Sequence, residues 1–596
     1  MPMAQLYVGM IIVTLFAGLI ASRFRPATLF VAAAGALYLP ALITSQELLH
    51  HYANESLVTL MLLLMGSMAL ERTRTLQWVS RKLLHKSQFI TLLKMMGWVS
   101  VTSAFLNNTA VVAALMQSVR KNREHPAQRL LIPLGYFAIL GGVLTLIGTS
   151  TNLVVNSFLM ETGHPGFGFF DFLPIGLGVL AVAGATVCVA AYLLPKGGGE
   201  QTISQDYFLD AKINDDSPLV GKTVQQAGLR ALDGLFLTEV VRRTAEGQKQ
   251  LITPVQPDTV LLANDGLVFC GDVKQAQLIS QLPGVSMFAQ AALNDNEEAT
   301  PNNGLLHNSL AEVIVSPTST LVGRTLKGAN FRGLFDAAVV AIGRGGERLS
   351  GKLGQVKIRA GDRLVLATSE DFYRHHNLEQ NFFLLESQRL SHTLTGKQEA
   401  ITLLGFAGVV LGTALGHFTL FTGLLTYLAI ILSTKVLSPA DIRRRLPVDI
   451  WLIIGSALCI ASVFVSSGLA NDVTNAFLWL LDRVTDNNVT PMAAMIGVFV
   501  MTWMITEVVT NNAAAAIVFP IAVGIAESLG VSIMPFVMAV TFGASASFIS
   551  PYGRQTNLMV MNAGNYRFKD FARIGVLVLV AYSVTALWLI PRVFVW

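Results

Sequence analysis

Residues 510–513 read Thr510-Asn511-Asn512-Ala513 and place two side-chain amides inside the otherwise apolar run 490–528. Residues 107–110 read Asn107-Asn108-Thr109-Ala110 inside the apolar run 88–119, at an offset of 511 − 108 = 403 positions. An unpaired amide is costly in hydrocarbon, so each pair needs partners inside the protein. Because a chain reversal also exposes helix-end amides and carbonyls, both stretches predict the tip of a helical hairpin that enters a membrane and turns back.

A second pair of polar stretches follows the hairpins. Gly148-Thr149-Ser150-Thr151-Asn152-Leu153 is echoed by Gly553-Arg554-Gln555-Thr556-Asn557-Leu558, at an offset of 553 − 148 = 405 positions. Upstream of the hairpins, Leu64-Met65-Gly66-Ser67 is echoed by Ile453-Ile454-Gly455-Ser456. Packing between membrane helices explains a single polar residue, but not the same stretches twice in the same order. The pattern therefore indicates two homologous halves, with helix breaks after Gly148 and Gly553.

The composition is that of an α-helical, polytopic membrane protein. Apolar residues make up 53% of the 596 positions, charged residues make up 13%, and the mean hydropathy is +0.56. An ordinary globular domain carries about 25% charged residues, so lipid must cover part of this surface. The net charge of +5 comes from short Lys and Arg clusters beside apolar runs. Such clusters are typical of membrane topology signals and argue against nucleic-acid binding.

Basic clusters also predict the orientation of the two halves. Arg23 and Arg25 follow the first apolar run, whereas the loops 45–55 and 161–168 contain no Lys or Arg. With the amino end outside, the positive-inside rule places every basic cluster in the cytoplasm and gives the second half the opposite topology. Inverted repeats with broken helices are typical of secondary transporters, whose substrate binds near the membrane midplane. Apolar runs long enough to span a bilayer occur at about 6–22, 27–44, 56–71, 130–160, 169–195, 400–416, 420–437, 448–468, 531–561 and 571–594.

The segment between the halves has a different composition. It is charged, contains no apolar run long enough to span a membrane, and carries a repeat of its own. Leu219-Val220-Gly221-Lys222-Thr223 recurs as Leu321-Val322-Gly323-Arg324-Thr325, at an offset of 321 − 219 = 102 positions. Strand-like runs follow each copy, so we expect a tandem pair of small cytoplasmic α+β domains. The expected domains are a first transmembrane half at 1–199, the inserted domains at 200–295 and 305–390 with a linker at 283–308, and a second transmembrane half at 396–596.

One motif in the insert suggests a nucleotide site but is better explained as a turn. Gly221-Lys222-Thr223 resembles the end of a phosphate-binding loop, but Asp216 stands where that loop requires a glycine. The motif also recurs with Arg324 in place of the lysine. An ATP-driven pump is therefore not supported.

The two polar stretches of each half resemble those of the divalent-anion/sodium symporter family, whose members carry sulfate or di- and tricarboxylates. The family's hairpin segment Thr-Glu-x-x-Ser-Asn-Thr-Ala matches Thr506 through Ala513, and the resemblance covers both membrane halves. The resemblance implies a sodium-coupled symporter that forms a homodimer and moves its substrate by an elevator-like motion. By the same resemblance, one sodium site is formed by Ser103, Asn107, Asn108 and Gly148, and a second by Thr506, the carbonyl of Val509, Asn511 and Gly553.

The chain departs from the family pattern after each hairpin. The usual Thr-Pro-Pro-Asn is replaced by Thr149-Ser150-Thr151-Asn152 and by Arg554-Gln555-Thr556-Asn557, which weakens the inference of a dicarboxylate substrate. Arg554 offers a planar fork of donors to an oxyanion; alternatively it is a topology signal, or Glu507 neutralises it. We expect a divalent oxyanion such as sulfate. Its expected ligands come from the hairpin tips and helix breaks: Asn107, Asn108, Thr109, Thr149, Ser150, Thr510, Asn511, Asn512 and Arg554.

The insert resembles, twice over, the C-terminal subdomain of the regulators of potassium conductance (RCK-C). This resemblance implies a regulatory ligand, which the sequence does not identify. We expect a multi-pass protein of the inner (plasma) membrane, in contact with lipid, with no enzymatic activity and no cofactor besides sodium as coupling ion. Proton coupling, a di- or tricarboxylate substrate and an anion-sensing receptor remain alternatives. A gated channel would need a selectivity filter of the T-V-G-Y-G type, and the sequence contains none.

Overall fold

The computed structural model divides into two compact units. One unit contains residues 1–197 and 390–596, and the other contains residues 198–389. The basic residues Arg23, Arg25, Lys121, Arg123 and Lys196, and the greater part of the predicted linker 283–308, lie outside the residues that the structure describes. The structure describes residues 2–21, 26–120, 122, 124–195, 208–229, 235–243, 249–252, 255–271, 279, 282–287, 310–316, 319–335, 337–344, 347–349, 353–368, 372, 378–384, 394–446, 448–484, 489–551, 553–564 and 566–596.

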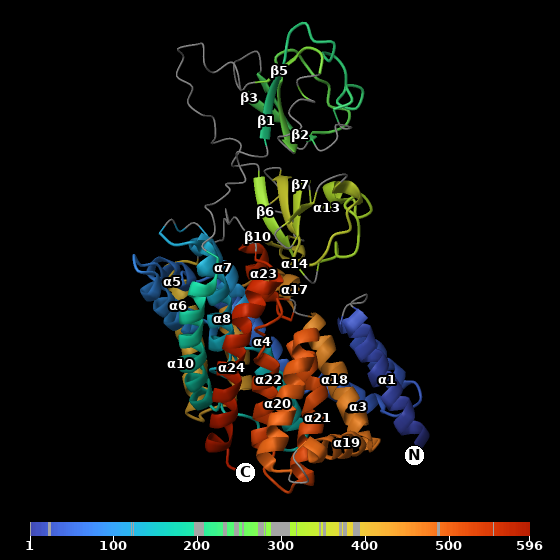
Figure 1. The fold of residues 1–596 in the computed structure, drawn as a ribbon, viewed down its shortest axis with the longest axis vertical. Coiled ribbons are helices and arrows are strands. Elements are labelled where there is room, and N and C mark those ends of the chain that lie inside the picture. The colour runs from blue at the N-terminus through green and yellow to red at the C-terminus, as the bar shows by residue number, and fades with distance from the viewer. Residues whose placement is uncertain are drawn as a thin grey trace. The chain divides into compact units, whose positions relative to one another are not determined.

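The first unit is helical, and its two halves contain corresponding series of helices (Figure 1). The first series is α1 (Pro2–Ala21), α2 (Pro26–Tyr38), α3 (Ser45–Tyr52), α4 (Glu55–Glu71), α5 (Thr75–Leu83), α6 (Gln88–Ser103), α7 (Asn108–Arg120), α8 (Leu131–Gly142), α9 (Ser150–Glu161) and α10 (Leu173–Ala190). The second series is α15 (Gly396–Ala414), α16 (Leu420–Ser433), α17 (Pro439–Arg445), α18 (Val448–Ser466), α19 (Leu469–Val484), α20 (Pro491–Val508), α21 (Asn511–Ser528), α22 (Met534–Ser545), α23 (Gln555–Ala563) and α24 (Phe568–Val593).

Several of these helices have the length and composition of membrane spans, which supports a polytopic membrane protein. Within the described residues, six helical segments are long and apolar enough to cross a membrane. Two of them, α20 and α21, lie in the stretch predicted as the second hairpin, and each is about 27 Å long at 1.5 Å per residue. The six segments are Ser45–Glu71, Leu173–Leu193, Val448–Ser466, Pro491–Val508, Asn511–Ser528 and Phe568–Val593.

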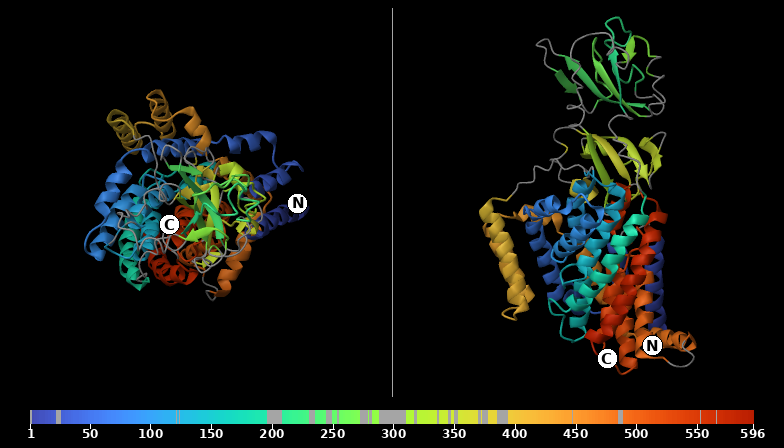
Figure 2. Two further views of the ribbon diagram at one scale, coloured as in Figure 1. Left: turned by 90° about the horizontal axis from the view of Figure 1, so that it is seen from above. Right: turned by 60° about the vertical axis from the view of Figure 1, so that its left-hand side comes forward.

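Two of the predicted spans are broken helices. The run 130–160 folds as α8 and α9, and the run 531–561 folds as α22 and α23. Hydropathy alone does not show these interruptions, because the residues between the helices are themselves largely buried. Helices α5 and α19 were not predicted from the sequence, because neither forms an apolar run long enough to span a membrane. Helix α19 lies nearly across its neighbours (Figures 1 and 2).

Helices of each half pack against helices of the other half. Helix α2 packs on α18 and α16 packs on α4, so each half contributes a helix to the other. The corresponding helices α10 and α24 pack on each other. Within each half, α6 packs on α8, and α20 packs on α22. At the α6–α8 contact, Gly141 lies against the backbone of Ser100 and leaves no room for a Cβ atom. The broken helices are therefore held at the centre of the unit.

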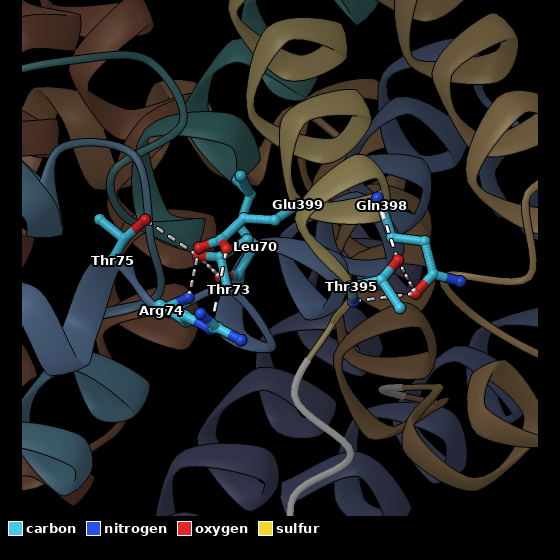
Figure 3. Close-up of polar contacts among 7 residues, drawn as sticks. All are labelled: Leu70, Thr73, Arg74, Thr75, Thr395, Gln398 and Glu399. Atoms are coloured by element: carbon cyan, nitrogen blue, oxygen red, sulfur yellow. Dashed lines mark hydrogen bonds and ion pairs between the residues drawn. The ribbon is translucent and has the colours of Figure 1, made fainter.

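Polar contacts join the loop after α4 to α15, the first helix of the second half (Figure 3). Glu399 accepts a hydrogen bond from the Arg74 backbone N–H at 2.8 Å, while Thr395 and Gln398 cap α15. Nearby, Arg72 forms an ion pair with Asp441 at 2.8 Å. Burial opposes ionisation of Asp441, but hydrogen bonds from Ser438 and the Arg72 guanidinium lower its pKa to about 2. The ion pair is therefore fully charged at neutral pH.

The second unit contains two antiparallel sheets with the same strand order. The corresponding strands β2 and β7, each second from one edge of its sheet, both carry a bulge, after Leu237 and after Val339, an offset of 102 positions (339 − 237). The first sheet contains β1 (Phe208–Ile213), β2 (Leu235–Arg243), β3 (Lys249–Ile252), β4 (Gly266–Gly271) and β5 (Val285–Met287) in the order β3-β2-β4-β1-β5. The second contains β6 (Leu310–Val315), β7 (Ala337–Arg344), β8 (Glu347–Leu349), β9 (Arg363–Thr368) and β10 (Phe382–Leu384) in the order β10-β6-β9-β7-β8.

Each sheet is stabilised by an equivalent ion pair between an arginine and a buried aspartate. Asp265 accepts hydrogen bonds from Arg242 Nε and Nη2 at 2.9 and 2.8 Å, and Asp362 accepts the same pair from Arg344 at 2.7 Å each. Both carboxylates are 1% exposed. The hydrogen bonds raise the pKa of both guanidinium groups. The Gly221 and Gly323 turns, both at φ +81°, occupy the same place in the two copies.

We expect Asp362→Ala to destabilise the second sheet by about 3–5 kcal/mol, because it leaves the Arg344 charge and a backbone N–H without their partner. Amide hydrogens of β9 should then exchange at least about a hundredfold faster in the full-length protein, since 1.4 kcal/mol corresponds to one decade. The matched control is Arg324→Ala, which removes an exposed arginine from the turn of the same sheet. Unchanged exchange in Asp362→Ala would show that the ion pair does not hold the sheet together.

Candidate functional site

The tip of the first hairpin brings together polar groups from three helices and a helix break. Helix α6 ends at Ser103 and α7 begins at Asn108. The Asn108 amide lies 2.6 Å from Ser103 Oγ and 3.2 Å from the carbonyl oxygens of Ala138 and Gly148. With its nitrogen facing these oxygens the amide donates to them, and with its oxygen facing them it completes a cluster of oxygen atoms. The predicted residues Ser103, Asn108 and Gly148 therefore meet in the structure.

The tip of the second hairpin repeats this arrangement. Thr506, at the end of α20, donates to Asn511 Oδ1 at 3.1 Å and to the Ala544 carbonyl at 2.9 Å. Gly553 lies so close that a Cβ atom there would be 3.0 Å from the Thr506 carbonyl oxygen. Val509, between the helices, has extended backbone torsion angles and is buried. The structure thus places Thr506, Asn511 and Gly553 together, in the positions that correspond to Ser103, Asn108 and Gly148.

Two asparagines hold the helix breaks in matching ways. Asn152 Nδ2 donates to the carbonyls of Thr145 and Gly142, at 2.8 and 3.5 Å. Asn557 Nδ2 donates to the carbonyls of Ser550 and Ser547, at 3.4 and 3.0 Å, at the same spacings of seven and ten residues. The other side-chain atom of each amide, Oδ1, is buried and has no hydrogen-bond partner. Both breaks therefore carry an oxygen that is available to a ligand.

Further buried polar atoms without partners gather at the second break. Ser545 Oγ, Ser547 Oγ and Thr556 Oγ1 have no hydrogen-bond partner, and all three residues are at most 3% exposed. Buried polar groups are normally satisfied in native proteins, and several unsatisfied groups in one place need an explanation. Hydroxyl and carbonyl oxygens are the ligands of hard cations such as sodium. The second break therefore has the chemistry of a cation site.

The two halves meet at the amino ends of α9 and α21. Ser150 Oγ and Thr151 Oγ1, in the first turn of α9, lie 3.2 and 3.3 Å from Asn512 Oδ1, in the first turn of α21. Helix amino ends carry a partial positive charge and free N–H groups, which favour anions. Around this contact Thr149 and Ser150 are half-buried, and Asn107, Thr510 and Gln555 are exposed.

Arg554 occupies the position in the second half that Thr149 occupies in the first. Both are N-cap residues, of α23 and α9, with φ, ψ of −135°, 141° and −138°, 144°. Arg554 Nη2 donates to the Ser545 carbonyl at 3.4 Å, and its Nε atom is buried without a partner.

Glu507 does not neutralise this arginine by an ion pair within the described part of the chain. Its carboxylate accepts hydrogen bonds from the backbone N–H groups of Ile549 and Ser550, at 3.2 and 2.8 Å, and from the Trp503 indole at 3.3 Å. The guanidinium group of Arg554 therefore keeps donors free for a ligand.

Comparison with known proteins shows the family of the chain. The family model for citrate transporters (CitMHS) matches residues 10–541. The chain belongs to the citrate transporter family. It is a multi-pass membrane transporter rather than an enzyme, and the transporter class expected from the sequence is confirmed at this level.

The relatives of this transporter have names that point to transport or to sulfur. A Chlamydomonas reinhardtii protein named for a regulatory role in the sulfur deprivation response is 30% identical over 94% of this chain and 98% of its own. An uncharacterized transporter of Synechocystis sp. is 30% identical over 90% of this chain and 88% of its own. Sodium/sulfate cotransporter 1 of Chlamydomonas reinhardtii is 28% identical over 62% of this chain, which spans 41% of that protein.

Most of these polar groups of the transporter were predicted from its sequence, and some were not. Thr109 is half-buried in the first turn of α7 and its N–H donates to Asn107 Oδ1 at 2.9 Å, so these two residues form a local turn at the tip. Asn152 and Asn557 were quoted in the repeated stretches but were not predicted as ligands. Ser545 and Ser547 were missed altogether, because the first half has no serines at the corresponding positions to mark them as a repeat.

Proposed function

We propose that this transporter is a secondary active symporter that moves a divalent oxyanion, with sulfate as its substrate and sodium as its coupling ion. The observation that carries the proposal is the meeting of two helix amino ends, at Ser150 and Asn512. Arg554, at the second helix break, adds a positive charge; its Nε atom is buried without a hydrogen-bond partner, and it forms no ion pair among the described residues. The names of the relatives, which include a sodium/sulfate cotransporter, point to the same substrate and ion.

The proposed anion site combines partial and full positive charge. Sulfate carries two negative charges at physiological pH and is strongly hydrated, so a site must replace both its charge compensation and its hydrogen bonds. The first turns of α9 and α21 offer free backbone N–H groups, and Thr149, Ser150 and Asn512 offer side-chain donors. Arg554 offers charge and two parallel donors. The remaining predicted ligands, Asn107, Asn108, Thr109, Thr510 and Asn511, line the hairpin tips.

Each proposed sodium site is formed by one hairpin tip together with the helix break next to it. In the first, Ser103 Oγ, Asn108 Oδ1 and the Gly148 carbonyl would surround the ion, with Asn107 beside them. In the second, Thr506, the Val509 carbonyl, Asn511 and Gly553 would do so, with Asn557 Oδ1 and Ser547 Oγ as further oxygen ligands. The unpartnered oxygens at the second break support this assignment, and at the first tip the Asn108 amide contacts Ser103 Oγ and the Gly148 carbonyl oxygen. Occupied sodium sites would hold the hairpin tips in the shape that the anion requires.

The wider architecture is part of the same proposal. The halves would be inverted repeats with re-entrant hairpins α6–α7 and α20–α21, and the hairpins with the broken helices would move as one elevator-like bundle. The amino end would face the outside of the plasma membrane and residues 200–396 the cytoplasm. The insert, with its two sheets of identical strand order, would be a pair of RCK-C-like domains that bind a regulatory ligand. The transporter would act as a homodimer.

A di- or tricarboxylate is the second candidate substrate, because the family model that matches the chain describes citrate transporters. Both candidates are multivalent anions and would use the same positive centre. They differ in size and shape. A tetrahedral oxyanion fits one compact cluster of hydrogen-bond donors, whereas a di- or tricarboxylate needs separate sets of donors for its carboxylate groups. The two helix amino ends meet at a single contact, between Ser150 and Asn512, which favours the oxyanion.

Uptake into proteoliposomes tests the proposal. We expect labelled sulfate to accumulate under an inward sodium gradient, to equilibrate without accumulation when potassium replaces sodium, and to be displaced by unlabelled sulfate more effectively than by succinate or citrate. Empty liposomes provide the background. Accumulation of succinate or citrate in preference to sulfate would assign the second candidate. Binding of sulfate with no counterflow of label would indicate a receptor instead.

A further inference from the structure

A second cluster of ligand-type side chains lies away from the transport site. His50 and His51, in the last turn of α3, and Glu161, at the end of α9, place their ligand atoms within 4.8 Å of one another. Glu161 Oε1 lies 3.0 Å from His51 Nδ1 and 3.5 Å from His50 Nδ1. Three ligand-type groups from two helices that are distant in the sequence thus converge on one point.

The buried histidine of this cluster faces the carboxylate with a ring nitrogen that forms no well-aligned hydrogen bond. His51 is 5% exposed, and its Nδ1 atom forms no hydrogen bond, although Glu161 Oε1 is only 3.0 Å away. The two groups are therefore in ion-pair contact without the geometry of a well-aligned hydrogen bond. Both atoms can instead face a common third atom, which is the arrangement of two ligands on one metal ion.

The distances agree with a tetrahedral zinc ion. Zinc binds histidine nitrogen and carboxylate oxygen at about 2.0–2.2 Å, which places neighbouring ligand atoms about 3.3 Å apart. The two nitrogen–oxygen distances, 3.0 and 3.5 Å, lie on either side of this value. His50 is largely exposed, so water can reach the fourth position. The carbonyl end of α3 adds a partial negative charge that favours a cation.

Neighbouring residues already hold the carboxylate in place. Asn54 Nδ2 donates to Glu161 Oε2, which leaves Oε1 to face the histidines. Asn54 is itself fixed, because its Oδ1 accepts a hydrogen bond from the Ser56 N–H at 2.8 Å as the N-cap of α4. Outer partners of this kind orient metal ligands and raise metal affinity. The cluster is thus organised before any ion arrives.

We propose that His50, His51 and Glu161 form a site for a divalent transition-metal ion, with zinc as the ion that fits best. The hard cation sites of the transport centre contain only oxygen ligands, whereas two imidazoles and one carboxylate select zinc-like ions. The site is separate from the transport centre, since residues 150 and 161 lie at opposite ends of α9, about 16 Å apart at 1.5 Å per residue.

The position of the site gives the metal a role in transport, and this step rests on the proposed function. Helix α3 is tied to α18, because Tyr52 OH lies 2.6 Å from Ser456 Oγ and Trp451 donates to the Tyr52 carbonyl at 3.0 Å. Helix α9 carries Ser150 at its other end. A metal ion held by both helices would keep α9 from moving relative to α3 and α18, and so would stop transport.

Zinc binding to purified full-length protein tests the site directly. We expect saturation at one zinc ion per chain, and a dissociation constant at least about tenfold higher in His51→Ala and in Glu161→Gln, since even loss of an outer partner costs about 10–100-fold. His164→Ala, which removes an exposed histidine three residues after Glu161, is the matched control and should bind like wild type. His51→Cys should restore binding through a thiolate, which separates loss of a ligand from misfolding.

The binding result stands whether or not the transport proposal is correct. Absence of saturable binding in wild type, or equal binding in wild type and both ligand variants, would overturn the metal site. In transport assays, zinc added on the side of the 45–55 and 161–168 loops should inhibit uptake by wild type and His164→Ala but not by His51→Ala. Zinc that binds at this site without slowing uptake would overturn the clamping role.

Discussion

Arg554→Ala is expected to weaken the apparent affinity for sulfate by at least about tenfold. The guanidinium group lies at the N-cap of α23, has a buried Nε without a partner, and forms no ion pair with Glu507 within the described residues. A charge-assisted hydrogen bond contributes roughly 1.5–3 kcal/mol net, and 1.4 kcal/mol corresponds to one decade of affinity. Loss of one such bond to sulfate is therefore enough for a tenfold effect, which equilibrium binding to purified protein measures.

Two companion variants separate the ligand role from a topology role. Arg554→Lys keeps the charge but loses the planar fork, so it should recover part of the affinity. Arg573→Ala removes an exposed arginine from the basic cluster that follows, and should lower insertion or expression without changing affinity. If Arg554→Ala behaves like Arg573→Ala, with normal affinity in the protein that survives purification, Arg554 is a topology signal and the case for sulfate over a dicarboxylate weakens.

Asn108→Ala and Asn511→Ala are each expected to reduce sodium-dependent uptake to the background level. The two amides occupy matching tips, 2.6 Å from Ser103 Oγ and 3.1 Å from Thr506 Oγ1. Each would supply an oxygen to the proposed sodium ion, and alanine has none. Folding should survive, because a hydrogen bond between membrane helices contributes about 0.6 kcal/mol on average. Initial rates of labelled sulfate uptake, measured over a range of sodium concentrations, give the result.

Asn562→Ala provides the matched control for this pair. Asn562 is a buried asparagine of α23, and its amide donates to the Leu558 carbonyl of the same helix at 2.8 Å. Its removal should leave sodium dependence unchanged. Wild-type uptake that ignores sodium and follows a pH gradient would refute the sodium assignment. Asn108→Ala protein that transports normally with an unchanged sodium requirement would instead show that the first tip does not bind the ion.

Much of the proposed site could be found from the sequence because the chain contains it twice. Asn108 and Asn511 stand at an offset of 403 positions, and Gly148 and Gly553 at an offset of 405, in a background of apolar residues. Polar residues are rare in membrane segments and costly without partners, so a repeated pair stands out. Ser545 and Ser547 could not be found in this way, since they have no counterparts in the first half.

Two membrane spans that the sequence predicted as continuous helices are interrupted in the structure. The apolar runs 130–160 and 531–561 were each predicted as one span, whereas each contains two helices. Hydropathy reports only how apolar a segment is, and both breaks are buried inside the protein. The short helices α3 and α17 were missed for the opposite reason, because they are too polar and too short to form an apolar run.

The sequence by itself determined that this protein is a membrane protein of two related halves with a sheet-forming insert, because composition and repeats are properties of the chain alone. Only the tertiary structure decided which groups meet. Ser150 lies beside Asn512 although 362 residues separate them, and Glu161 lies beside His51 across 110 residues (161 − 51). Such contacts depend on how the helices of one half pack into the other. Local propensity and hydropathy describe neighbours along the chain, and they contain no information on which distant helices share a face.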